Sequence, residues 1–128
     1  MNQEKISEMI MKLELIPSKI AKHSVELLDL NEKLQESITE INQLESAIKS
    51  SVNSAEDANG KKLYSNAEAR EAAFLQIAFD DEGLKRSKEV QAELQRKISL
   101  ERIQIEALSN EQRNARTIVQ YFSSLHEV

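Results

Sequence analysis

The sequence predicts an all-α protein, folded as a long antiparallel two-helix coiled-coil hairpin. Three observations lead to this fold class. Only 2 of 128 residues are Gly and 1 is Pro, so the chain lacks the turn formers that an all-β sandwich or barrel needs. Aliphatic residues recur every seven positions through most of the first half, which is typical of a coiled coil. One turn-rich segment divides the chain into two arms of matched length, which suits a hairpin.

Composition excludes several classes of protein. The chain has no Cys, which excludes a disulfide scaffold, a zinc ribbon and thiol catalysis. Its 17 Lys and Arg against 22 Asp and Glu give a net charge of −5, unlike the basic balance of an obligate nucleic-acid binder. No apolar run is long enough to span a membrane, and three Glu occur in the first fifteen residues, where a signal peptide would be apolar. We therefore expect a single helical domain over residues 1–128, in the cytoplasm and with no membrane partner.

The first arm is predicted as a helix over about residues 2–56. One position of its seven-residue repeat is occupied by Ile6, Leu13, Ile20, Leu27, Leu34, Ile41, Ile48 and Ala55, and the companion position by Met9, Ile16, His23, Leu30, Ser37, Leu44 and Ser51. Pro17 lies inside this repeat, where it removes a backbone donor. Because the repeat keeps its phase on both sides of Pro17, we favour one kinked, nearly continuous helix. Two separate helices are the alternative.

The turn is predicted over about residues 57–66, where Asn59-Gly60 and Ser65-Asn66 are turn signals. Ser65 and Glu68 have the spacing of a capping box, in which Ser65 accepts from the third helical amide and Glu68 reaches back to the cap. A second helix is therefore expected to begin near residue 67.

The second arm is predicted as a helix over about residues 67–124. Its repeat places Ile77, Leu84, Ile98, Ile105 and Val119 at one seam position and Leu94, Leu108, Ala115 and Phe122 at the companion position. Gly83, which follows three consecutive acidic residues, weakens a helix interior and predicts a local bend.

Folding about residue 62 pairs positions whose numbers add to 124 or 125. This register places Ile41 near Leu84. It also sets the polar seam residues His23 and Ser37 opposite two polar residues of the second arm, Glu101 and Ser87. We expect His23 and Glu101 to lie at the exposed edge of the seam rather than to form a buried pair.

A two-helix hairpin has one apolar seam, yet the sequence contains more apolar residues than one seam can bury. The excess lies near the turn and at the open end. We interpret it as an interface for self-association, a homodimer above all, or for a protein partner; bends that bury both groups internally are the alternative. The candidate interface residues are Phe74, Leu75, Ala78, Phe79, Met9, Met11, Val119 and Phe122.

No catalytic constellation can be assembled from the sequence. It has no phosphate-binding or dinucleotide-binding glycine motif, and no nucleophile, base and pocket lie together. No enzyme activity, cofactor or metal is therefore expected. One charged stretch is a candidate nucleic-acid contact, although its i,i+4 ion pairs are also typical of an ordinary exposed helix face; it comprises Lys85, Arg86, Lys88, Arg96, Lys97 and Arg102.

The segment from Asn59 to Arg70 reads Asn-Gly-Lys-Lys-Leu-Tyr-Ser-Asn-Ala-Glu-Ala-Arg. With the acidic patch and long helix that follow, it resembles a group of small, mostly uncharacterised coiled-coil proteins of phages, prophages and mobile elements, which share an N-G-K-x-L-Y-S-N-x-x-x-R turn between two long helices. The resemblance covers roughly the second half of the chain. It implies an accessory role in recombination or replication inside a bacterial host cell, and it transfers no catalytic residue.

Our functional hypothesis is a non-enzymatic coiled-coil protein that binds another protein, as an accessory factor in phage or mobile-element DNA metabolism. A nucleic-acid-binding module that uses the Lys85–Arg102 face is one alternative. An inhibitor of a host defence enzyme, whose acidic surface engages a DNA-binding groove, is the other.

Overall fold

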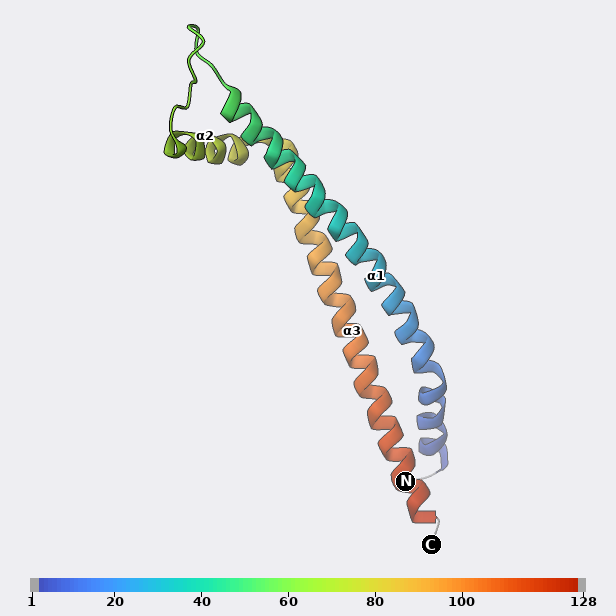
Figure 1. The fold of residues 1–128 in the computed structure, drawn as a ribbon. Coiled ribbons are helices and arrows are strands. Elements are labelled where there is room, and N and C mark those ends of the chain that lie inside the picture. The colour runs from blue at the N-terminus through green and yellow to red at the C-terminus, as the bar shows by residue number, and fades with distance from the viewer. Residues whose placement is uncertain (1–2, 127–128) are drawn as a thin grey trace. The chain divides into compact units, whose positions relative to one another are not determined.

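The computed structural model describes residues 3–126 and confirms the all-α hairpin (Figure 1). Helix α1 spans Gln3–Ser54, α2 spans Ala67–Asp80 and α3 spans Glu82–His126, and α1 packs against α3. The contacts form two compact units. Unit 1 joins α1 up to Asn31 with α3 from Arg96 onward, and unit 2 comprises residues 32–95.

Helix α1 is continuous through Pro17, which excludes the alternative of two separate helices. Pro17 lies on the exposed side, while its neighbour Ile16 is buried in unit 1. Water can therefore reach the backbone near the proline while the packing of Ile16 holds the chain in place. The predicted start of this arm at residue 2 lies outside the described residues, and its end at Ser54 falls slightly before the predicted residue 56.

The connection between α1 and α2 is a tight turn built around Asp57. The Asp57 carboxylate oxygen Oδ1 accepts hydrogen bonds from the backbone amides of Asn59 at 2.8 Å and Lys61 at 3.0 Å. Gly60 has a φ of 78°, in the left-handed region that favours glycine. An isolated bridge between Glu56 and Lys62 closes the turn. The predicted Asn-Gly turn is thus present.

Helix α2 begins at Ala67, as predicted, but its cap differs from the predicted one. The side chain of Asn66, not of Ser65, accepts from the Ala69 amide, at 2.8 Å. Because the helix starts one residue later than a Ser65 cap requires, Glu68 lies in the first turn of the helix, where its charge suits the helix dipole, and not at the third position of a capping box. The capping-box assignment of Ser65 and Glu68 is therefore wrong.

The cap can be tested by comparing two neighbouring substitutions. Asn66→Ala is expected to lower the free energy of unfolding by about 1 kcal/mol, because it leaves a helix-end amide without its acceptor. Ser65→Ala should change it by less than about 0.5 kcal/mol, as exposed substitutions usually do. Urea denaturation followed by far-UV circular dichroism measures both. If Ser65→Ala lowered the free energy of unfolding as much as Asn66→Ala or more, the capping box of Ser65 and Glu68 would be supported instead.

The second arm is two helices, not one, because the chain breaks at Asp81. This residue is extended (φ −75°, ψ 114°), and its Oδ1 accepts from the Leu84 amide at 2.7 Å, so Asp81 caps α3. The expected bend at Gly83 is thus a break two residues earlier. A Cβ on Gly83 would lie 3.3 Å from the Asp81 carboxylate, so glycine leaves room for the cap.

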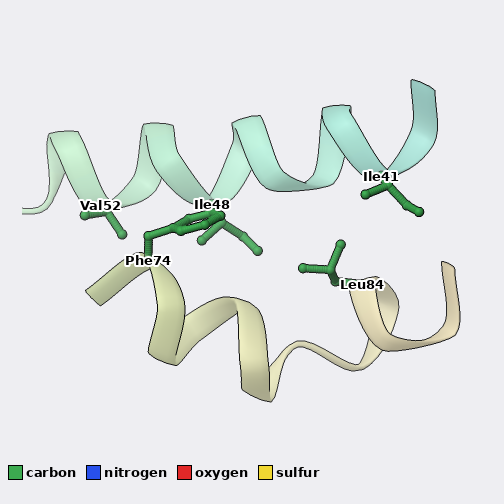
Figure 2. Close-up of a cluster of buried hydrophobic side chains, with 5 residues drawn as sticks. All are labelled: Ile41, Ile48, Val52, Phe74 and Leu84. Atoms are coloured by element: carbon green, nitrogen blue, oxygen red, sulfur yellow. The ribbon is translucent and has the colours of Figure 1, made fainter. Parts of the chain in front are cut away.

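The break changes which face of α2 is buried. Ile77, a predicted seam residue, is exposed. Phe74 is instead buried in unit 2, in a cluster with Ile48, Val52 and two further residues, Ile41 and Leu84, while Ala73 and Ala78 pack against the cluster. Figure 2 shows Phe74 pointing from α2 toward Ile48 and Val52 on α1, with Leu84 and Ile41 facing each other farther along.

The predicted register holds within each unit. In unit 2, Ile41 and Leu84 belong to one buried cluster, as expected. In unit 1, His23 contacts Glu101, a pair whose numbers add to 124, and Lys12 Nζ lies 3.3 Å from an oxygen of Glu111. The residue nearer the start of α1 contacts the residue nearer the end of α3. The two helices are therefore antiparallel in unit 1.

Candidate functional site

The predicted interface residues near the turn separate into buried and exposed groups. Phe74 is 9% exposed and belongs to the core of unit 2. Ala78 packs against that core. Leu75 and Phe79 remain 57% and 73% exposed. The assignment of Phe74 and Ala78 to an interface is therefore corrected: α2 turns these two side chains toward α1, which is the internal burial left open as an alternative.

We call the exposed side of α2 that carries Leu75 and Phe79 the α2 outer face. The two residues are four positions apart, so they lie on one side of the helix. Lys85 from α3 stands 5.4 Å from the centre of the Phe79 ring, a cation–π distance. Its Nζ also lies 3.8 Å from a Glu82 carboxylate oxygen. The outer face thus combines an aliphatic side chain, an exposed ring and a lysine.

At the open end, three of the four predicted interface residues contribute to packing within unit 1. Met9, Val119 and Phe122 are half-buried, as expected for seam positions. Met11 is exposed. The Phe122 ring makes an edge-to-face contact with Tyr121, with centroids 5.3 Å apart. Only Met11 of this predicted group therefore offers most of its side chain to a partner.

The candidate nucleic-acid residues are all exposed on α3 but do not form one stripe. Leu84 and Ser87 mark the two buried seam positions of the heptad. The heptad has five other positions, and each of them is occupied by at least one of the six cations. The cations therefore point to all sides of the helix outside the seam. A phosphate backbone lying along one side of α3 would meet only some of them.

The His23–Glu101 pair lies at the edge of the seam in unit 1. His23 Nδ1 is 2.6 Å from Glu101 Oε2, and the side chains are 33% and 21% exposed. The predicted pairing is therefore present, and both side chains keep contact with solvent, in line with the expected seam-edge position. A hollow of about 340 Å³ beside the pair is lined by Lys19, Lys22 and Glu26 as well.

Sequence reasoning missed a set of exposed apolar residues on the outer sides of α1 and α3. These are Val25, Leu28, Val90 and Leu100. The signal was available, because each of them stands outside the two seam positions of the heptad. Scattered single residues of this kind are ordinary, so only their surroundings can indicate a role.

Among the described residues, no group of three or more His, Cys, Asp or Glu side chains is arranged to hold a metal ion. The helices in the same part of the chain include none that is long and apolar enough to cross a membrane. No protein-family model, curated protein or solved structure matches the chain.

Proposed function

We propose that the chain is a non-enzymatic coiled-coil protein that binds another protein through the α2 outer face. We further propose that it acts as a homodimer in the cytoplasm of a bacterial host cell, as an accessory factor in the DNA recombination or replication of a phage or mobile element.

The exposure of Phe79 is the observation that carries this proposal. An aromatic ring that is 73% exposed keeps a large apolar area in water, and interface hot spots are enriched in aromatic residues. Leu75 extends the apolar area along the same side of α2. Lys85, which lies over the Phe79 ring, favours a partner that brings a carboxylate to the edge of an apolar patch.

The role in DNA metabolism rests on the resemblance of the turn segment alone. Two residues of that motif have structural tasks here. Gly60 adopts the left-handed conformation of the turn, and Asn66 caps α2. In this chain the motif therefore builds the hairpin turn and starts α2, the helix that carries the proposed binding surface.

An experiment on the α2 outer face tests the proposal. Tagged protein is used to capture partners from bacterial cells that carry the phage or mobile element, and the double variant Leu75→Ser/Phe79→Ser is compared with wild type. We expect the variant to retain the partner at least about tenfold more weakly, because it loses the apolar anchor.

A matched control is the double variant Val25→Ser/Leu28→Ser, which removes two equally exposed apolar side chains from α1 in unit 1. It should retain the partner like wild type, and circular dichroism should show unchanged helix content in both variants. Equal capture by the wild type and the α2 variant would rule out the outer face as the binding surface.

Inhibition of a host defence enzyme is a second candidate that one observation favours. Unit 2 carries 13 Asp and Glu against 8 Lys and Arg, so its surface is acidic and could occupy a DNA-binding groove. Recovery of a DNA-binding defence enzyme in the capture experiment would support this candidate over an accessory role.

A further inference from the structure

The seam of unit 2 contains one level at which both helices contribute a serine. Ser37 on α1 and Ser87 on α3 are 6% and 8% exposed, in places where a coiled coil normally carries aliphatic side chains. We call this level the serine layer. Because serine is much smaller than leucine, the layer leaves space that the chain itself does not fill.

Two adjoining hollows occur at the serine layer. One, of about 250 Å³, is lined by Ser37 together with Val90 and Leu94. The other, of about 350 Å³, is lined by Ser87 together with Leu44 and again Val90. Glu40 lines both hollows. Val90 lines both as well, so the two hollows are neighbours, and we call them together the serine-layer groove.

Ser37 has an unmet hydrogen-bonding requirement in this groove. Its Oγ is buried and has no hydrogen-bond partner among the described residues, although burial of an unpaired hydroxyl is unfavourable. By contrast, Ser87 Oγ donates to Glu40 Oε1 at 3.4 Å. Ser37 therefore makes the serine layer a less stable level of the seam than an aliphatic pair would make it.

The charges along the groove are of both signs. Glu36 and Glu40 line it from α1, as does Lys33, while Arg86 lines it from α3. A surface that carries both signs can complement itself when two copies meet about a two-fold axis, because Arg86 of each copy can then face Glu36 or Glu40 of the other.

The exposed area is large enough for such a contact. A stable interface buries about 1,200–2,000 Å² in total, so each copy contributes about 600–1,000 Å². This is a small part of the 9487 Å² that the chain exposes.

We propose that the serine-layer groove is the docking site for a second copy of the chain, with Val90 of each copy inserted into the groove of the other. Val90 is 55% exposed, so its side chain is accessible to a partner. The inference rests on the homodimer of the proposed function and assigns that homodimer a surface, separate from the α2 outer face.

Sedimentation equilibrium of the full chain over a wide concentration range tests the assignment. Wild type is expected at twice 14.6 kDa, and Val90→Lys should weaken dimerisation at least about tenfold, because the contact between the two copies would then bury a lysine charge in place of an apolar side chain. Val25→Lys, at a valine that is 68% exposed in unit 1, is the matched control and should leave the dimer intact.

A second variant separates loss of docking from loss of folding. Ser37→Leu fills the hollow from within and completes the seam, so we expect a higher melting temperature together with weaker dimerisation. If both Val90→Lys and Ser37→Leu dimerised as strongly as wild type, the groove would not be the docking site, although the protein would still be a homodimer. A monomeric wild type would overturn both, while binding through the α2 outer face is decided independently by the capture experiment.

Discussion

Phe74→Ala is expected to lower the free energy of unfolding by about 3 kcal/mol, as the removal of a buried aromatic side chain does in other cores. The Phe74 ring packs between α2 and α1 against Ile48 and Val52 (Figure 2). It also lies 5.1 Å from the ammonium group of Lys49. Its loss removes the main contact that holds α2 to α1. Urea denaturation followed by far-UV circular dichroism measures the change.

Phe79→Ala is the control for this prediction, because Phe79 is a phenylalanine on the same helix that is largely exposed. Its free energy of unfolding should change by less than about 1 kcal/mol, because only the exposed cation–π contact with Lys85 is lost. If the two alanine variants were equally stable, Phe74 would not be the residue that anchors α2, and the corrected division between core and interface would be wrong.

Leu84→Ala is expected to destabilise the protein by a similar amount, about 3 kcal/mol. Leu84 is 1% exposed and is the largest fully buried side chain among the described residues. It packs with Ile41 directly after the break at Asp81. The same denaturation experiment applies, and a cavity at this site should also speed unfolding.

Leu100→Ala provides the comparison on the same helix, since Leu100 is exposed. We expect its unfolding midpoint to stay close to that of wild type. A loss as large in Leu100→Ala as in Leu84→Ala would mean that α3 presents a different face to α1 and that the register is wrong.

The long-range pairing of α1 with α3 could be predicted from the sequence because it depends on few quantities. A seven-residue repeat determines which side of each helix is buried, and the position of the turn determines which levels meet. The register, in which paired position numbers add to 124 or 125, was therefore enough to predict two contacts. These are the proximity of Ile41 to Leu84 and the contact between His23 and Glu101.

The break at Asp81 could not be predicted in the same way, because local and tertiary effects compete there. The repeat alone extends the helix through Asp81, and Gly83 is the more obvious weak point. The Asp81 side chain, however, can bond the Leu84 amide, which makes a cap competitive with a continued helix. Once the helix is broken, α2 is free to turn Phe74 inward, and the predicted seam position of Ile77 no longer applies.

The candidate surfaces were only partly predictable for a related reason. A count of apolar residues showed that some must lie outside one seam, and Leu75 and Phe79 do. The count could not show that Phe74 is buried while Leu75 and Phe79 are exposed. Which of these side chains faces α1 depends on how α2 is rotated about its own axis. The serine layer was recognised as polar residues facing each other, but the hollows beside it depend on side-chain packing that the repeat does not describe.

We propose that this chain acts by contacting proteins and not by contacting nucleic acid. Fluorescence anisotropy of labelled single-stranded and double-stranded DNA, at low and at near-physiological salt, tests it most directly. Because the six cations of the Lys85–Arg102 stretch surround α3 and the net charge is −5, we predict that no binding persists at the higher salt. Saturable binding that persists there, and that is lost in the triple variant Arg86→Glu/Arg96→Glu/Lys97→Glu, would contradict the claim and establish a nucleic-acid-binding module.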